Sequence, residues 1–497
     1  MLVNARVLTL DPGQPVAEAL AIQGDRICAV GMRAELSRMV SSQTQVLDAG
    51  GGTAVPGFHD AHLHLLSYAR ATARVDCSEV SSLAELVSRI AARARCTLVN
   101  RWVRAVRFDE YSLPSDTLPD RHVLDRASVA HPVRLQHRSL HLDVLNTMAL
   151  RELGIWDTEH PSIEREELSG EPTGRLFHAA ELLRGRLERP PFSEIAAKVR
   201  EACTQLASYG VTTIQDASLT NGLSQWKLFH QLAAGGHLAG LRVFMMPGME
   251  HWQEVPDSLP ATASVRLGPV KLMLNEGHTN PCTARAAVAE AHAAGRAVAV
   301  HAVSEAELVL ALDALTSVPG NAPRAGPDRI EHGAVIPEAL LGDLQRAGVT
   351  VVGQPGLVYD RGDVYAQQFA PELHAWVHRA NSLLQAGIAY AIGSDAPVLE
   401  PRPLLSLLAA HHRMTRSGAR LRASESLTLE QGLRAITSQA ARSVGMGHDL
   451  GRLQPGALAD VTVLAPHALD STTMEGSSDA IRITIGAGRI LWHAEGF

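Results

Sequence analysis

The stretch "VPGFHDAHLHL", Val55 to Leu65, decides how the rest of the sequence is interpreted, because it places three histidines in a run that otherwise predicts a buried strand. Side chains alternate between the two faces of a strand, so His62 and His64 share one face and His59 points to the other. Asp60 has the parity of the pair but lies deeper along the strand. Two imidazoles on one face predict a metal site if further ligands reach the same point.

Seven further runs of this kind follow, separated by Ala- and Leu-rich segments of helical period, which is the pattern of βα units in a parallel sheet. The eight runs are residues 55–65, 211–217, 241–247, 270–277, 297–303, 329–333, 350–355 and 389–397. Eight strands that alternate with helices predict an α/β fold of the (β/α)8 TIM-barrel type. We expect this barrel to span residues 55–449.

The two ends of the chain have a different pattern. "ARVLTL", "ALAIQG" and "RICAVG" near the start, and "PGALADVTVLAP" and "AIRITIGAGRILW" near the end, are short alternating runs separated by turn residues. We expect residues 1–54 and 450–497 to form one composite β-sandwich, so that the barrel is inserted between its two parts.

The interval between the first two barrel strands is too long for one helical crossover. We expect residues 66–194 to form an inserted lid or subdomain. Its segments "RFDEYSLP", "HLDVLNTMAL" and "GEPTG" are interpreted as loops and short helices.

Composition excludes several classes of function. The chain has 497 residues, 20% charged residues and a formal net charge of -7, and it lacks a basic tract, which argues against nucleic acid or an anionic membrane as partner and favours a small-molecule substrate. Its five cysteines form no CxxC pair, which is typical of reduced thiols. No run of 18 apolar residues occurs, so we expect a cytoplasmic protein.

Ionisable or metal-capable side chains end five of the eight runs, at the end of the strands where barrel active sites are built. They are His62 and His64 on the first run, Lys271 on the fourth, His301 on the fifth, His332 on the sixth and Asp395 on the eighth. Neutral imidazoles with a carboxylate are the usual ligands of a zinc-type ion when thiolates are absent. The sequence therefore predicts a metal centre, while His59 is interpreted as a core or supporting histidine.

Lys271 needs a separate explanation because an ammonium group is repelled by a divalent ion. A neutral lysine can react with carbon dioxide to give a carbamate, which bridges two ions as a carboxylate does. The alternative is a one-metal site in which Lys271 pairs with Asp395. In the two-metal interpretation, the pair of ions would activate water and polarise a carbonyl. The expected ligands are His62, His64 and Asp395 for one ion, His301 and His332 for the other, and carboxylated Lys271 between them.

Six motifs then establish a resemblance. "PGFHDAHLHL", "PVKLMLNEG", "AVAVHAVSEAE", "IEHG", "IGSDAPV" and the closing "GRLQPGALADVTVL" resemble, in order, those of the amidohydrolase superfamily, in the branch of N-substituted formamide deformylase. The resemblance implies a hydrolase with two zinc ions that cleaves a C–N bond in an amide, N-formyl, N-acyl, carbamate or urea compound. It also implies that Asp395 carries a proton from metal-bound water to the leaving nitrogen, and that the protein is a homodimer.

Some positions depart from that branch without touching the expected metal ligands. Ser139 and Leu140 stand where Asp-Gly usually precedes the insert's histidine, Asn275 stands where the fourth strand usually carries Asp, and His178 stands where Glu is common. The resemblance implies that His141 contacts substrate from the insert, although an ordinary surface histidine fits the sequence as well. Asn275 and Gln354, at strand ends, either touch substrate or bind loop backbone.

Two other functions compete with the leading one. A one-metal deaminase of a cyclic amidine often has a glutamate three residues after the fifth-strand histidine, but here position 304 is Ser and Glu305 lies one residue too far. A non-catalytic relative that uses the barrel for binding or assembly would be marked by lost ligands, and none of the expected ligands is lost.

Overall fold

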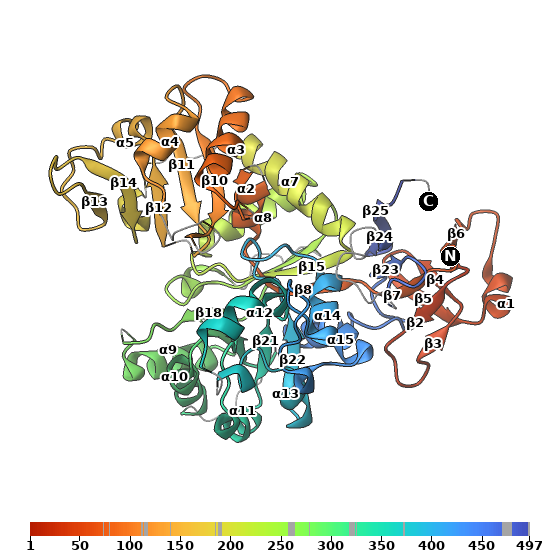
Figure 1. Ribbon diagram of the computed structural model, residues 1–497. Coiled ribbons are helices and arrows are strands. Elements are labelled where there is room, and N and C mark those ends of the chain that lie inside the picture. Colours follow the sequence, from red (N-terminus) through yellow and green to blue (C-terminus); the bar gives the residue numbers. More distant parts are fainter. Residues whose placement is uncertain are drawn as a thin grey trace. The chain divides into compact units, whose positions relative to one another are not determined.

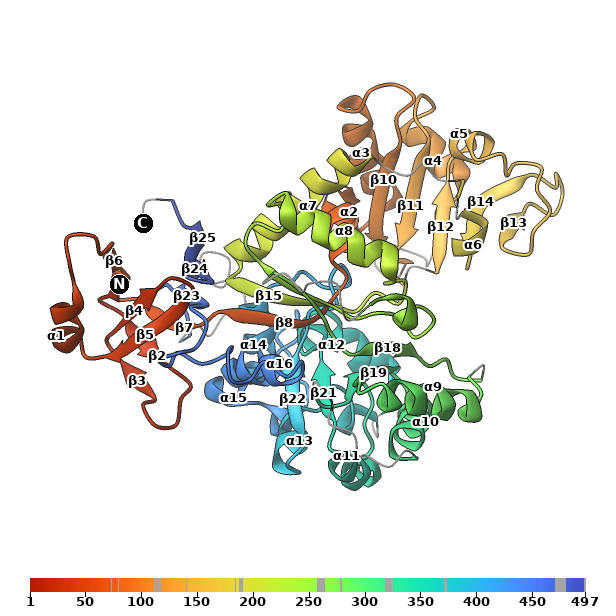
Figure 2. The ribbon, with the colours of Figure 1, turned by 180° about the vertical axis from the view of Figure 1, so that it is seen from behind.

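The structure, a computed structural model, describes residues 1–72, 74–78, 80–110, 113, 118–139, 141–183, 185–186, 191–256, 264–277, 279–317, 324, 326–370, 373–469 and 480–495. The chain divides into two compact units (Figure 1; Figure 2): unit 1 contains Met1–Leu65 and Val199–Phe497, and unit 2 contains Leu66–Lys198. Within the described ranges, no helix combines the length and the apolar character that a membrane crossing requires.

Strands from both ends of the chain share one core in unit 1. A four-stranded sheet has the order β5-β4-β1-β6, and a six-stranded sheet has the order β25-β24-β23-β7-β2-β3. The first contains β1 (Leu2–Val3), β4 (Ala19–Gln23), β5 (Arg26–Gly31) and β6 (Leu47–Asp48), and the second contains β2 (Arg6–Leu8), β3 (Val16–Ala17), β7 (Thr53–Pro56), β23 (Val461–Leu464), β24 (Ile481–Gly486) and β25 (Arg489–His493). Leu20 of the first sheet and Val7 and Val463 of the second belong to one buried cluster. Both sheets contain parallel as well as antiparallel pairs. The limits of the composite sandwich as a domain stay a prediction.

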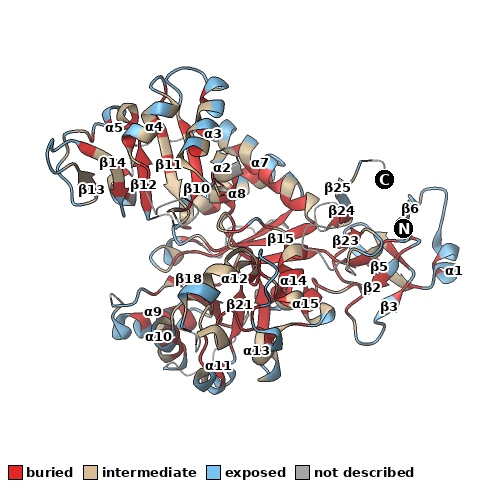
Figure 3. Ribbon diagram, in the orientation of Figure 1, coloured by how far each residue is buried: buried red, intermediate tan, exposed pale blue. Residues whose placement is uncertain are grey.

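Two wholly parallel sheets carry the strand ends on which the expected ligands lie. Their orders are β17-β16-β15-β8 and β18-β19-β20-β21-β22. The first contains β8 (Phe58–Leu63), β15 (Val211–Asp216), β16 (Arg242–Met245) and β17 (Val265–Leu267), and the second contains β18 (Val270–Met273), β19 (Val298–Ala302), β20 (Arg329–His332), β21 (Thr350–Gly353) and β22 (Ala389–Ile392). Their strands are largely buried (Figure 3), as expected for parallel sheets covered on both faces.

Helices connect these strands and begin at recognisable caps. The helices of unit 1 are α1 (Arg33–Leu36), α8 (Leu223–Ala234), α9 (Pro281–Ala293), α10 (Glu305–Thr316), α11 (Leu341–Ala347), α12 (Gly356–Gln368), α13 (Asn381–Gln385), α14 (Pro403–His412), α15 (Leu429–Ala435) and α16 (Ser438–Arg442), and α7 (Phe192–Ser208) runs across the boundary between the units. Ser304 and Glu307 form a capping box at the start of α10. Asn280 caps α9, whose first residue is Pro281.

Each of the eight runs identified in the sequence contains one of these parallel strands, which confirms the α/β class. The structure adds β17, which Gly268 and Pro269 separate from β18. Backbone contacts link the two sheets at both sides: Gly248 forms a parallel bridge with Lys271, and Asp395 N donates to the carbonyl of His62 over 2.7 Å. Closure of the sheets into one eight-stranded barrel stays a prediction.

Unit 2 corrects the interpretation of the insert as loops and short helices. It contains a six-stranded sheet of order β13-β14-β12-β11-β10-β9. The strands are β9 (Val75–Asp76), β10 (Val103–Phe108), β11 (Val133–His137), β12 (Leu142–Leu145), β13 (Ile163–Arg165) and β14 (Pro172–Phe177), and the helices are α2 (Leu65–Thr72), α3 (Leu83–Arg95), α4 (Arg121–Ala127), α5 (Thr147–Glu152) and α6 (Ala180–Leu183). "HLDVLNTMAL" therefore contains a strand and a helix, and "GEPTG" contributes to a strand. Arg107 and Phe108 of "RFDEYSLP" end β10, while residues 111, 112 and 114 lie outside the described part.

Gly174, the second glycine of "GEPTG", explains why this segment is a strand and not the expected loop. Gly174 lies inside β14 with φ +93°, and a Cβ at this position would stand 2.4 Å from the carbonyl oxygen of Leu145 on β12. The residue permits a close backbone approach between two strands, whereas the sequence suggested a turn. Glycine has both uses, so its presence alone does not distinguish them.

Candidate metal centre

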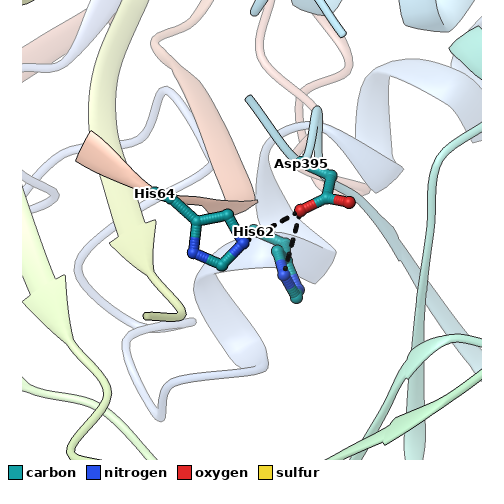
Figure 4. A group of neighbouring side chains, drawn as sticks. All are labelled: His62, His64 and Asp395. Atoms are coloured by element: carbon teal, nitrogen blue, oxygen red, sulfur yellow. Dashed lines mark hydrogen bonds and ion pairs between the residues drawn. The ribbon is translucent and has the colours of Figure 1, made fainter. Parts of the chain in front are cut away.

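Three of the expected ligands lie together at the ends of β8 and β22. Asp395 Oδ1 is 3.1 Å from His64 Nε2 and 3.5 Å from His62 Nε2 (Figure 4). The ligand atoms of the three residues lie within 4.8 Å of one another, a spacing that could accommodate one ion. Parity along β8 therefore led to the correct expectation that the first two histidines face the same point.

The other two expected histidines continue this group. The ring centroids of His62 and His332 are 4.8 Å apart, and those of His332 and His301 are 4.6 Å apart. The imidazoles thus form a continuous row from His64, which directly follows β8, to His301, with the others contributed by β8, β19 and β20.

Local backbone geometry allows two of the ligands to join the row. His332 has φ +71° and Asp395 has φ +57°, both in the left-handed region that side chains other than glycine rarely adopt. At His332 this conformation ends the regular alternation of β20. Gly393 precedes the Asp395 turn, and a Cβ there would stand 2.6 Å from Cβ of His62, so the glycine permits β22 to approach β8. Such strain at a strand end is typical of functional sites.

The second ring nitrogen of three histidines has a protein partner. His62 Nδ1 donates to the Glu331 carboxylate, and His332 Nδ1 donates to Gln354 Oε1 over 3.0 Å. His64 Nδ1 lies 3.2 Å from Ser218 Oγ. Because these contacts occupy Nδ1, they leave Nε2 of each ring to face the common point, as in metal sites whose ligands are oriented by outer partners.

Lys271 is buried beside this group without a hydrogen-bond partner. The side chain lies on β18, its residue is 2% exposed, and Nζ has no bonded neighbour among the described residues. Burial lowers the pKa of Lys271 to about 8, against the opposing effect of the Glu331 and Asp395 carboxylates. A buried amine without a partner fits a group that is modified in the working protein.

The charge states of the imidazoles suit ligation. Burial lowers the pKa of His62 to about 4, that of His332 to about 4 and that of His301 to about 3, so these rings are neutral at neutral pH. Burial opposes the charged form of His64 too, but the bond to Asp395 and the negative charges of Asp395 and Asp216 together raise its pKa.

Asp395 remains a carboxylate in this environment. Burial alone would raise its pKa, but the bond from His64 and the neighbouring rings of His332 and His62 hold the pKa of Asp395 below its usual range. A carboxylate that is ionised at neutral pH can bind a cation or accept a proton.

His59 and Asp60 lie outside the row of ligands. His59 is buried, stacks on Phe244 and has its Nε2 2.9 Å from Gln215 Nε2. Asp60 Oδ1 accepts hydrogen bonds from the backbone N of His62 and of Ser394, which joins the ends of β8 and β22. Burial raises the pKa of Asp60 to about 6.

The expected substrate contacts lie in different environments. His141 is exposed in unit 2, and its ring centroid is 4.9 Å from that of His178. Asn275 is exposed after β18, and its backbone N donates to Thr279. Gln354 is fully buried and holds His332, which gives it an orienting role.

Sequence reasoning missed three residues that support the ligands: Glu331, its partner Arg329, and Ser218. A signal was available for two of them, because "RIEHG" places Arg329 and Glu331 on the same face of a strand interpreted as buried. Charges buried at such positions have to be paired.

A second group of metal-capable atoms lies in unit 2. Asp109, Glu110 and His137 bring ligand atoms within 4.8 Å of one another. Protein partners already hold this histidine, because its Nε2 lies 2.6 Å from Glu110 and its Nδ1 lies 2.7 Å from Ser139. Arg138 pairs with Asp109. These contacts account for the group as an ion-pair cluster.

Comparisons with known proteins agree with this arrangement. The amidohydrolase family matches residues 45–492. The N-substituted formamide deformylase of Arthrobacter pascens is 28% identical, with 96% of this chain and 95% of that protein aligned. The Protein LONG AFTER FAR-RED 3 of Arabidopsis thaliana is 27% identical over 99% of this chain and 91% of its own length.

A solved structure has a similar fold. The metal-dependent hydrolase of Pyrococcus horikoshii superimposes with a TM-score of 0.77 at 21% identity, covering 96% of this chain and 98% of that one. The family match covers residues 45–65 and 199–492 of unit 1 and the whole of unit 2. The chain therefore belongs to the amidohydrolase family.

Proposed function

We propose that this protein is a metal-dependent hydrolase that cleaves the C–N bond of a small amide, N-formyl or N-acyl compound, or of a carbamate or urea. The observation that carries the proposal is the convergence of His62, His64 and Asp395 on one point, with His332 and His301 continuing the row. Membership of the amidohydrolase family supports the class of bond. We also propose that the two parallel sheets close into a barrel around this point.

The residues present fit two zinc-type ions. One would be held by His62, His64 and Asp395, and the other by His301 and His332, with Lys271 between them. The fit rests on His62 and His332, whose Nδ1 atoms are held by Glu331 and Gln354 so that Nε2 could bind an ion, and on the unbonded Nζ of buried Lys271. The neutral amine attacks carbon dioxide, an N–C bond forms, one proton is released, and Lys271 becomes a carbamate with two ligand oxygens.

The ions, when bound, supply Lewis acidity and make water a nucleophile at neutral pH. The proton transfer and the positioning of the reacting groups are carried out by residues of the chain itself. Asp395 is ionised, accepts a proton at its carboxylate and returns it to the leaving nitrogen. His64 holds this carboxylate in place over 3.1 Å.

Metal content and activity test the proposal together. Purified protein is stripped with a chelator, reloaded with zinc in bicarbonate buffer, and assayed on N-formyl, N-acyl, carbamate and cyclic amide compounds. We expect two ions per chain, no hydrolysis after stripping, and recovery on reloading. Protein that binds no divalent ion would contradict the proposal.

The deaminase alternative gives a different result, namely one ion per chain and release of ammonia from a cyclic amidine. Two observations argue against this alternative: Ser304 caps α10, and Glu305 is exposed in the first turn of that helix. We therefore expect no deamination by the reloaded protein.

A further inference from the structure

A buried ion pair lies next to the candidate metal centre and has no part in the proposed chemistry. Arg329 and Glu331, both on β20, are each 0% exposed. Arg329 Nε donates to Glu331 Oε1 over 2.7 Å, and its Nη2 donates to Oε2 over 3.0 Å. The second of these carboxylate oxygens also accepts the hydrogen bond of His62 Nδ1.

The pair is also fixed to the strand that carries the first two histidines. Arg329 Nη2 donates to the carbonyl of Ala61 over 2.8 Å, one residue before His62, and Nη1 donates to Gln215 Oε1. Arginine, carboxylate and imidazole thus form one chain of contacts between β20 and β8. Neither end of this chain can shift without breaking a bond.

Stability alone does not explain a buried pair of this kind. Removing two charges from water costs free energy, and well-packed apolar side chains at such positions often stabilise a protein equally well or better. The His62 contact gives the pair a specific use, since a carboxylate on the outer nitrogen of a ligand histidine fixes its tautomer and makes it a better donor.

We propose that Glu331, anchored by Arg329, is a positioning residue that keeps the proton of His62 on Nδ1 and so presents Nε2 to the ion held by His62, His64 and Asp395. The proposal rests on the proposed function. It deepens that function by making the two metal positions unequal, because the outer partner of His332, at the other position, is the neutral side chain of Gln354. The position that includes His62 is therefore the tighter one.

Zinc affinity tests this role separately from activity. The dissociation constant of the tighter ion is measured by competition with a chromophoric chelator, alongside the melting temperature. Glu331→Gln removes the charge but keeps an acceptor, and we expect about tenfold weaker binding. R329M/E331L removes the whole pair, and we expect binding roughly 10- to 100-fold weaker with a melting temperature close to that of the unmodified protein.

A matched control distinguishes this role from a general effect of buried charges. Arg242 Nη1 donates to Asp460 Oδ2 over 2.8 Å, and both residues are buried. Asp460→Asn leaves this arginine without its carboxylate, as Glu331→Gln does for Arg329. We expect it to lower the melting temperature and to leave zinc affinity unchanged.

The tautomer gives a second readout that does not depend on metal. The histidines of metal-free protein are labelled with nitrogen-15, and the ring signal of His62 is assigned as the one that disappears in His62→Asn. We expect this ring to carry its proton on Nδ1 in the unmodified protein and to lose that preference in R329M/E331L. Unchanged zinc affinity in R329M/E331L, an equal loss in Asp460→Asn, or a proton on Nε2 of His62 would each overturn the positioning role. Absence of zinc binding by the unmodified protein would instead overturn the proposed function.

Discussion

The two halves of the candidate metal centre differ in how far the chain itself completes them. His62, His64 and Asp395 already lie within contact distance, and charged or polar partners hold them from outside. In the other half, His301 and His332 pack ring against ring, while Nζ of Lys271 has no partner among the described atoms. The first half is preorganised, whereas the second needs the carboxylate oxygens that Lys271 would gain only as a carbamate. We therefore expect the first half to bind its ion first.

Asp395→Asn gives the largest expected effect and tests the completed half. The amide keeps the shape of the side chain but neither accepts the proton nor binds a cation as well, so we expect kcat to fall about 10²- to 10⁴-fold. Steady-state kinetics on the best substrate measure the change, with circular dichroism as the control for folding. Activity above a tenth of the original would contradict the assigned role.

Lys271→Ala tests the incomplete half. Without the amine no carbamate forms, so we expect bound zinc to fall from two ions to one and activity to fall roughly a hundredfold or more, since two-metal catalysis needs both ions. Metal analysis and kinetics are compared with and without added bicarbonate, which should promote reloading of the unmodified protein only. Two ions and full activity in this variant would exclude the carbamate.

Gly393→Ala tests whether the close approach of β22 maintains the first half. The new Cβ would stand 2.6 Å from Cβ and 2.7 Å from the backbone N of His62, so the strands have to separate. We expect the free energy of unfolding to fall by about 1–3 kcal/mol, as in overpacked cores.

Urea denaturation measures this loss, and Gly342→Ala is the control. Gly342 lies in α11, where a Cβ would meet only a flexible arginine tip at 3.4 Å, so this change should be neutral or stabilise the helix. Equal stability of the two variants would show that β22 adjusts without cost.

Gln354→Met is expected to leave catalysis at the first half intact and tests the neutral partner of the second half. The change leaves Nδ1 of buried His332 without an acceptor, which costs about 1–3 kcal/mol. We expect a loss of several-fold or more in affinity for the second ion and none for the first, measured by stepwise chelator competition. An equal loss at both positions would remove the distinction between the halves.

The clustering of the candidate metal-binding residues could be predicted because each combines a metal-binding residue type with a position at the end of a strand. His62, His301 and Asp395 end separate runs of strand character, and parallel strands bring such ends to one edge. Glu331 could not be identified in this way, because its role depends on which histidine of another strand faces it. Left-handed backbone at His332 and Asp395 likewise follows from packing rather than from local preference.

The eight parallel strands could be predicted from their apolar runs, but the sheet of unit 2 could not. Its strand β10 carries Arg104 and Arg107 among apolar residues, and β12 carries Asp143, so charges obscure the strand pattern. Gly174 also obscures the pattern, because a glycine that permits a close approach between two strands looks the same in the sequence as a glycine in a turn. Local composition does not predict a strand where pairing with a strand distant in the sequence decides the conformation.

The pairing of β7 with β23 has a consequence for biosynthesis. Ala54 lies opposite Val463, and both belong to the core that also contains Val7. While the ribosome makes the intervening residues, β7 has an open edge and its core is incomplete, a state that favours wrong pairing with other chains. The N-terminal strands can reach their final arrangement only after β23 has emerged, so their protection during synthesis depends on chaperones or on the rapid folding of the segments between.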